Sequence, residues 1–160
     1  MHNLENLKIR KIEKDDFQTV FDMMRTFYDS PAVLYEVGND ILIKDIEACV
    51  DSGNPFIEGY IFDIDGVRAG FSMVSKSFST EAGGLTLWIE DLYIKPEYRG
   101  KSIGTKFFNF LESNVSENTV RFRLEVEEDN IKAINVYKKC GYKESTYIQM
   151  LKEINPLKQK

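Results

Sequence analysis

Apolar and polar residues follow two different periods along this chain, and each period predicts a different kind of element. Apolar residues recur at every third or fourth position in four segments, which indicates helices with one buried face: 15–28, 41–50, 103–113 and 130–139. Alternating or β-branched patterns bounded by turn residues indicate six strands: 7–11, 56–62, 67–77, 85–94, 119–126 and 147–151. Asp65 and Gly66, between the second and third strands, are typical of a tight hairpin.

The order of these elements predicts the fold class. The early strands follow one another directly and favour antiparallel pairing, whereas the later ones are separated by helices. We therefore expect an α/β (α+β) protein with a mixed central β-sheet of six to seven strands, flanked by about four helices. A chain of 160 residues fits one domain, 1–160, with a sizeable core.

Composition excludes several classes of function. The formal net charge of −5 argues against a general nucleic-acid surface, because phosphate backbones are bound chiefly through Lys and Arg. Apolar runs fall far short of the roughly 20 residues of a membrane helix, and we expect a cytoplasmic protein with no membrane partner. The two cysteines lack metal-ligand spacing and the one histidine is His2, so we expect no metal site and no disulfide.

The segment 90–105, EDLYIKPEYRGKSIGT, carries the clearest chemical signal. An apolar strand runs into a basic loop that opens a helix, and the N–H groups of a first helical turn attract anions. Gly100 and Gly104 allow close approach of a ligand, and Arg99 and Lys101 add positive charge. A nucleotide-binding P-loop is excluded, because Lys95 stands where that motif requires glycine.

A second constellation occupies 130–142, after the strand at 119–126. Asn130 is well placed to begin a helix, Tyr137 lies two turns later, and Gly141 suits the left-handed residue that ends it. Tyr137 is therefore either within reach of a ligand beside the helix or a core aromatic residue. Asn130 is correspondingly a ligand contact or a plain helix cap.

Together the two constellations resemble the GNAT superfamily of N-acetyltransferases. RGKSIG at 99–104 is similar to the family's acyl-CoA signature, and 130–142 matches its later Asn-x-x-Ala-x-x-x-Tyr-x-x-x-Gly-Tyr motif. Ser102 replaces the first glycine of the signature, which the loop accommodates if φ there is not strongly positive. The resemblance implies acetyl-CoA as cosubstrate, bound by Leu92, Tyr93, Ile94, Arg99, Gly100, Lys101, Ser102, Ile103, Gly104, Thr105, Asn130, Ala133, Asn135 and Tyr137.

The resemblance also implies catalytic roles. An ammonium group with a pKa of about 10.4 must lose a proton before it attacks a thioester, and Glu90 is the candidate base. Tyr137 would protonate the departing CoA thiolate. A bulge and splay near Asp91 and Leu92 would free main-chain groups for pantetheine and for the developing oxyanion. Direct attack is implied, and strict alternation would place Glu90 on one face with Trp88 and Leu92.

The acceptor is the open part of the prediction. The strand at 85–94 looks most like the polyamine (spermidine/spermine, or diamine) branch, so we expect a small-molecule primary amine. The candidate substrate contacts are Tyr28, Asp29, Glu90 and Asp91, with Glu36 and Glu81 as further acids. Alternatives are an amino acid, an aminoglycoside-like amine, a protein N-terminus, or a non-catalytic acyl-CoA-binding module. The family also implies a homodimer, for which the apolar strand at 147–151 is the sequence support.

Overall fold

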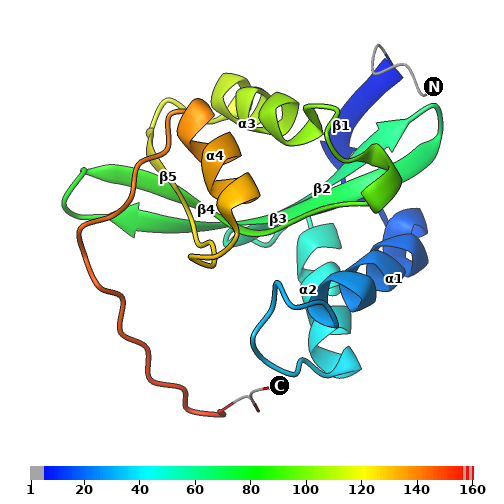
Figure 1. The fold of residues 1–160 in the computed structure, drawn as a ribbon, viewed down its shortest axis with the longest axis horizontal. Coiled ribbons are helices and arrows are strands. Elements are labelled where there is room, and N and C mark those ends of the chain that lie inside the picture. The colour runs from blue at the N-terminus through cyan, green and yellow to red at the C-terminus, as the bar shows by residue number, and fades with distance from the viewer. Residues whose placement is uncertain (1–5, 157, 159) are drawn as a thin grey trace.

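A mixed β-sheet runs through the middle of the molecule (Figure 1). The computed structural model describes residues 6–156, 158 and 160. Within them the sheet has the order β1-β2-β3-β4-β5, with β5 parallel to β4 and all other pairs antiparallel. Its strands are β1 (Leu7–Lys11), β2 (Ile57–Ile64), β3 (Val67–Ser79), β4 (Gly84–Ile94) and β5 (Thr119–Leu124).

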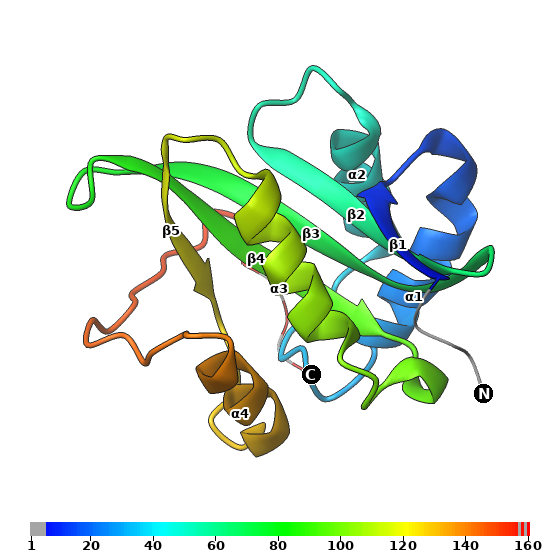
Figure 2. The same cartoon turned by 90° about the horizontal axis from the view of Figure 1, so that it is seen from above.

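Helices cover both faces of the sheet, and a separate core lies on each side (Figures 1 and 2). The α1/α2 face carries buried aliphatic side chains of both helices, and the α3/α4 face is dominated by aromatic residues of α3. The helices are α1 (Phe17–Tyr28), α2 (Asn39–Val50), α3 (Ile103–Asn114) and α4 (Ile131–Lys139), with short 3-10 turns at Lys14–Asp16 and Pro96–Tyr98. The fold class predicted from the sequence is confirmed.

The predicted number of strands is wrong, because the described residues contain five rather than six to seven. The expected last strand, 147–151, is extended chain that pairs with no other strand. Its pattern satisfies the side-chain requirement of a strand, but a strand also needs a neighbouring backbone with which to exchange hydrogen bonds. The predicted hairpin is confirmed: Asp65 and Gly66 both have positive φ, 52° and 80°.

Strand β4 contains a bulge at Glu90. On β3, Met73 pairs with Asp91 and Val74 pairs with Ile89, so Glu90 is an extra residue without a partner. The bulge implied by the family resemblance is therefore present, one residue earlier than expected.

The bulge reverses the alternation of side chains along β4. Before and after it, Ile89 and Leu92 both pack on the α3 side, whereas Asp91 and Tyr93 turn toward α1 and α2. The expectation that Glu90 and Leu92 share a face is therefore wrong, because strict alternation holds only in a regular strand.

Strands β4 and β5 also separate at this point. Their last paired residues are Ile89 and Leu124, and from residue 90 to 94 β4 is bordered by β3 but has no β5 partner. This splay leaves main-chain groups of β4 without a β5 partner, in the segment where the sequence predicted pantetheine binding.

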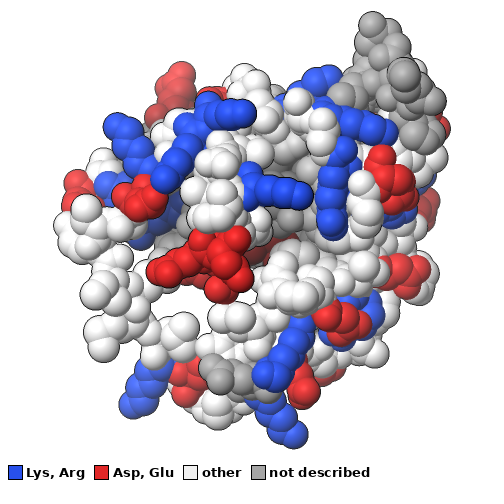
Figure 3. Space-filling model, in the orientation of Figure 1, with Lys and Arg blue, Asp and Glu red and all other residues white. Residues whose placement is uncertain are grey.

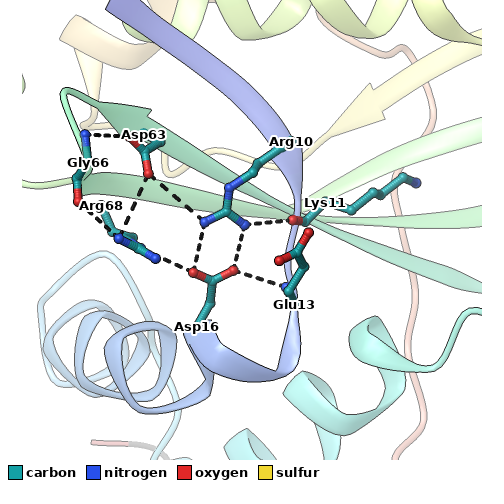
Figure 4. A network of polar contacts seen from close by, with 7 residues as sticks. All are labelled: Arg10, Lys11, Glu13, Asp16, Asp63, Gly66 and Arg68. Atoms are coloured by element: carbon teal, nitrogen blue, oxygen red, sulfur yellow. Dashed lines mark hydrogen bonds and ion pairs between the residues drawn. The ribbon is translucent and has the colours of Figure 1, made fainter.

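A buried ionic network ties β1, β3 and the start of α1 together (Figure 4). Asp16 is only 1% exposed and accepts two hydrogen bonds from Arg10, at 2.6 and 2.9 Å, and one from Arg68 at 3.1 Å. The N–H of Glu13 donates a further bond to the same carboxylate, at 3.0 Å. The Asp16 charge is therefore fully compensated, and the two guanidinium groups hold the pKa of this carboxyl down at about 2.

Candidate active site

The loop before α3 ends in two residues with left-handed backbone. Gly100 has φ 73°, and an added Cβ would meet no atom within 4 Å, so glycine is required there by conformation rather than by space. Ser102 has φ 61° and ψ 19°, and it caps α3 with its side chain exposed. The condition under which serine fits this loop easily, a φ that is not strongly positive, is therefore not met. A non-glycine residue in this conformation costs about 1 kcal/mol.

The start of α3 has main-chain donors that lack intrahelical partners. The first intrahelical bond runs from Lys106 N–H to Ser102 O, at 3.0 Å, so the N–H groups of Ile103, Gly104 and Thr105 lie ahead of the helical hydrogen-bond series. An added Cβ at Gly104 would lie 4.0 Å from the nearest atom, so the main chain is openly accessible. These donors and the helix dipole fit an anionic group such as a diphosphate.

Basic side chains gather around this helix start (Figure 3). Arg99 is anchored by a 2.8 Å hydrogen bond to the carbonyl oxygen of Ile94, and the Lys101 ammonium lies 5.2 Å from the ring centre of Tyr98. Both predicted cations thus border the N-terminus of α3, where they add to its positive potential.

The second constellation packs against the first. Asn130 accepts a 3.3 Å bond from Ala133 N–H as the cap of α4, and Gly141 ends the helix with φ 88°. The Tyr137 ring packs edge-on against Phe108 of α3, with ring centres 5.8 Å apart. The Cys140 thiol lies 3.9 Å from the Thr105 hydroxyl, so α4 approaches the first turn of α3.

Tyr137 is thus half-buried on the α3 side, and burial raises the pKa of its hydroxyl. A neutral hydroxyl at physiological pH can donate a proton. The two structural alternatives, a helix cap for Asn130 and a packed aromatic ring for Tyr137, are both realised. Asn135 lies on the exposed part of α4.

On the opposite face of the sheet, acidic residues gather beside the bulge. The Tyr28 hydroxyl, at the end of α1, donates to Asp91, with both carboxylate oxygens at 3.0 Å. Asp91 is 6% exposed. The Ser75 hydroxyl donates to the Glu90 carboxylate, which is exposed to solvent. The two acids are adjacent in sequence, but only Asp91 is buried.

This acidic group carries little compensating charge. Burial, together with Asp45 and Glu90, raises the pKa of Asp91 to about 7 against the opposing effect of the Tyr28 hydrogen bond. Burial and the neighbouring Glu90 also raise the pKa of Asp45, which projects from α2. A cation entering here would relieve both the repulsion and the desolvation, so the geometry fits a positively charged ligand.

A family profile decides the identity of the chain: that of the acetyltransferase (GNAT) family matches residues 10–142. The chain belongs to the GNAT family. It is an acetyl-CoA-dependent N-acetyltransferase. The start of α3, the splayed part of β4 and Tyr137 are the parts of this GNAT fold that the sequence motifs and the family resemblance had indicated.

Individual relatives of this GNAT chain agree with the family assignment. The thialysine N-epsilon-acetyltransferase of Sus scrofa is 28% identical over 155 residues, covering 89% of this chain and 88% of that protein. A possible acetyltransferase from Clostridium difficile 630 has a similar fold, with a TM-score of 0.78, 24% identity, and coverage of 94% and 99% of the two chains. The aminoglycoside N-acetyltransferase AAC(6')-Iy, solved in complex with CoA, has a TM-score of 0.75 at 13% identity, covering 93% and 95%.

One member of the acidic group of this GNAT chain was not predicted. Asp45 lies on α2 between Leu42 and Cys49, at the spacing of the helix's buried stripe. An acid on an apolar stripe is a signal that the sequence contains, and it would have indicated a functional carboxylate.

Three predicted acids lie elsewhere. Asp29 is 64% exposed and pairs with Arg25 at 2.7 Å, and no contact joins it to Asp91. Glu81 pairs with Arg121 at 3.1 Å near the β3–β4 turn, and Glu36 is exposed in the loop between α1 and α2. These positions were predicted from charge alone, which does not specify where a residue lies in the fold.

Within the described part of the chain, no group of three or more candidate side chains is arranged to hold a metal ion. The same residues include no helix that is both long and apolar enough to cross a membrane.

Proposed function

We propose that this GNAT enzyme acetylates a primary amine of a small polycation, such as a diamine or polyamine. The observation that carries the proposal is the group formed by Asp45, Glu90 and Asp91 beside the β4 bulge, which has more negative charge than its own surroundings compensate. The similarity to thialysine N-epsilon-acetyltransferases of Sus scrofa and Mus musculus supports an amine carried on a short chain with a second charged group.

The residues around the start of α3 fit the cosubstrate. Acetyl-CoA supplies the acetyl group as an activated thioester. The N–H groups of the α3 first turn, with Arg99 and Lys101, would hold its diphosphate. The edge of β4 that has no β5 partner, at Leu92, Tyr93 and Ile94, would hold the pantetheine arm. The Tyr93 side chain is buried toward α1 and α2, so it would take part only through its backbone.

The splay between β4 and β5 is where the two faces would meet. Tyr137 packs against the same α3-side core as Leu92 and Ile94, whereas Asp91 faces α1 and α2 from the segment of β4 that has no β5 partner. An amine bound among the acids would therefore approach from the face opposite the diphosphate site. This arrangement suits direct attack in a ternary complex, and a main-chain N–H near the bulge would stabilise the developing oxyanion.

We assign the acids two different tasks. Glu90 is exposed at the bulge and would accept the proton of the reacting ammonium, directly or through water. Asp91 and Asp45 would bind the second positive charge of the acceptor and fix its position. Tyr137 would return a proton to the departing thiolate.

The proposal is tested by measuring CoA release from acetyl-CoA with matched amines. 1,4-Diaminobutane and butylamine have the same chain length and differ in one charge, so we expect at least a tenfold higher kcat/KM for the diamine. Spermidine, lysine, an aminoglycoside and a peptide with a free N-terminus complete the panel. Equal rates for the diamine and the monoamine would exclude a site for two charges. A preference for lysine, the aminoglycoside or the peptide would mean that the acceptor belongs to that class and not to the small polyamines.

The role of Tyr137 has its own test. Tyr137→Phe should lower kcat about 10²-fold with little change in acetyl-CoA affinity, because only the proton donor is removed. Tyr142→Phe is the matched control, since Tyr142 packs on the same Phe108 ring. An unchanged rate in Tyr137→Phe would remove it as the acid.

A cytoplasmic location and a homodimer stay predictions. The sequence support for the homodimer is the apolar segment 147–151, which follows α4.

A further inference from the structure

The sheet face that carries the acceptor acids continues beyond them as an uncovered surface. Helices α1 and α2 lie below the half of the sheet that is farther from β5, and in the described chain no helix covers the same face near β5 and the β3–β4 turn (Figures 1 and 2). Of the buried hydrophobic residues of β4, only Tyr93 belongs to the core under α1 and α2. A linear amine that reacts at Glu90 therefore has two directions open to it: inward beneath these helices, or outward along the uncovered face.

Two rows of paired residues cross this uncovered face. Residues that pair directly on adjacent strands have their side chains on the same face. The rows run across β3, β4 and β5 and consist of Ser75, Trp88 and Arg123, and of Ser77, Thr86 and Arg121. Leu87 and Ile89, which alternate with them along β4, pack on the opposite face against α3. The Ser75 hydroxyl also donates to Glu90, so the first row borders the candidate base.

The charge along this face changes sign from one end to the other. Beside the bulge, the acid group described above leaves an excess of negative charge. At the β5 end, Arg121 and Arg123 provide two positive charges near one carboxylate, that of Glu81. Arg121 pairs with Glu81 at 3.1 Å; its hydrogen bond chiefly lowers the pKa of that carboxyl, and the Arg123 charge adds to the effect. The positive charge of Arg123 is therefore left without an ion pair among the described residues.

Arg123 also covers an aromatic ring that a cationic ligand would favour. The central carbon of its guanidinium lies 5.4 Å from the ring centre of Trp88. The face of a tryptophan ring attracts alkylammonium and guanidinium groups alike, and here it already holds a cation. Trp88 and Glu90 are two residues apart on β4, and adjacent strands lie about 4.8 Å apart, so the backbones of Arg123 and Glu90 are within about 10 Å of each other.

The inward direction suits one further charge. Cys49 borders the acid group on the α2 side, where burial, together with the charges of Asp45 and Asp91, raises the pKa of its thiol to about 12. Leu42 and Ile46, on the same stripe of α2, are fully buried. An ammonium group paired with Asp91 and Asp45 therefore has apolar side chains beyond it, which favours an acceptor that ends there.

We propose that Arg123 is a specificity-determining residue: it excludes positive charge from the uncovered face, so that the acceptor extends inward and carries two ammonium groups rather than three or four. The inference rests on the proposed function, because it concerns the same acceptor site.

A longer polyamine is disfavoured in both directions. Its third or fourth ammonium group would enter the apolar region beyond Asp91 if the chain extends inward, and would meet Arg123 if it extends outward. The distance to Arg123 is comparable with the screening length of about 8 Å at physiological ionic strength, so the two positive charges repel each other. Placing like charges together in this way discriminates against the longer amine without strengthening the binding of the shorter one.

The first experiment compares CoA release with 1,4-diaminobutane and with spermine, which both end in primary amines and differ in length and charge. Wild type should have at least a tenfold higher kcat/KM for the diamine at low salt. Arg123→Gln should raise the ratio of spermine to diamine kcat/KM at least fivefold, through a lower KM for spermine, and Arg123→Glu should raise it further. Arg123→Lys keeps the charge and should keep the wild-type ratio. Lys8→Gln removes an exposed charge of β1, at the other edge of the sheet, and should not change the ratio.

The second experiment separates repulsion from a structural role of Arg123. Repulsion between charges at a surface is screened by salt, so the difference in ratio between wild type and Arg123→Gln should shrink as NaCl is raised to about 0.5 M. A difference caused by altered packing around Trp88 would persist at high salt and would overturn the proposal. Thermal melting confirms that each variant is folded.

The outcomes distinguish this inference from the proposed function. Equal kcat/KM for the two amines in wild type, or a ratio that Arg123→Gln leaves unchanged, would overturn the inference, while turnover of the diamine would still support the proposed function. No turnover of either amine would overturn the proposed function. Titration calorimetry of the two amines on wild type and Arg123→Gln then decides the inference: the ratio of affinities should shift in the same way, and an unshifted ratio would overturn it.

Discussion

Asp16 and Asp91 are both buried aspartates, yet their surroundings shift the carboxyl pKa in opposite directions. Asp16 accepts hydrogen bonds from Arg10 and Arg68, which hold its pKa at about 2. Asp91 accepts from the neutral Tyr28 hydroxyl and lies near Asp45 and Glu90, and burial raises its pKa to about 7. Burial alone therefore does not indicate the role of an acid.

The difference lies in whether the fold itself supplies the countercharge. The Asp16 charge is neutralised by Arg10 of β1 and Arg68 of β3. It therefore holds these strands to the start of α1 and has no charge left to bind a ligand. The Asp91 charge is left for something outside the chain. An uncompensated buried carboxylate is costly, and its presence beside the β4 bulge indicates selection for binding rather than for stability.

Asp16→Asn should have the largest effect, a loss of about 3 kcal/mol in the free energy of unfolding. The substitution removes the buried charge that accepts hydrogen bonds from both Arg10 and Arg68. Denaturant unfolding at pH 7 measures it. Asp63→Asn is the control, since Asp63 lies 4.0 and 3.9 Å from the same two guanidinium groups. A loss no larger than in the control would show that Asp16 is not a structural acid.

The pH dependence of this loss has a definite sign. Because folding lowers the pKa of Asp16 below its usual 3.8, its contribution is present above about pH 4 and disappears as the pH falls through about 2. The stabilities of wild type and Asp16→Asn should therefore converge in acid.

Glu90→Gln should come next, with a fall in kcat/KM of about 10²-fold and little change in stability. The loss should be greatest at low pH, where unprotonated amine is scarce. Glu81→Gln removes an exposed acid away from the bulge and should leave the rate nearly unchanged. A variant whose pH profile matches wild type would argue against Glu90 as the base.

Asp91→Asn should stabilise the free protein by about 2 kcal/mol at pH 8 and lower activity toward diamines. Folding raises the pKa of Asp91, so wild type loses stability as the pH rises from about 4 through about 7, whereas asparagine does not titrate. Thermal melting at pH 5 and pH 8 measures the difference, which should be clearly smaller at pH 5, where Asp91 of the folded protein is mostly protonated. Asp29→Asn removes an exposed acid, and its difference in stability from wild type should be the same at both pH values.

Tyr28→Phe should have the smallest effect, a loss of about 1 kcal/mol at neutral pH, because one hydrogen bond to Asp91 is removed. The Tyr28 bond lowers the pKa of Asp91, so the midpoint of the pH-dependent loss of stability should move upward. Tyr147→Phe removes a hydroxyl bonded to the exposed Glu81 and should stay within about 0.5 kcal/mol. No shift of the midpoint would mean that Tyr28 and Asp91 are not coupled.

Local features of the fold and site could be predicted from the sequence. The Asn130 cap, the stop at Gly141 and the hairpin at Asp65-Gly66 depend on backbone preferences within a few residues, and all three are confirmed. The left-handed φ of Ser102 was missed because the surrounding loop imposes a conformation that serine does not prefer.

Long-range features could not be predicted. The burial of Asp91 and its contact with Tyr28 depend on a bulge that no single residue signals, and Asp45 reaches the group through packing of α2 on the sheet. The segment 147–151 has a strand pattern, but pairing requires a neighbour that sequence periodicity does not contain.

The bulge at Glu90 also determines which changes in chain length the enzyme can tolerate. Deleting Glu90 itself would remove the bulge without exchanging faces, because Ile89 and Asp91 already lie on opposite faces of the sheet. Deleting a residue before Ile89 would instead exchange the faces of the residues between that point and the bulge, and would place Ile89 among the acids. Outside the bulge, the strand can therefore diverge by substitution but not by a change of length. The exposed turn between β3 and β4 carries no such restriction, so length variation among homologues should accumulate there and be absent between residues 85 and 89.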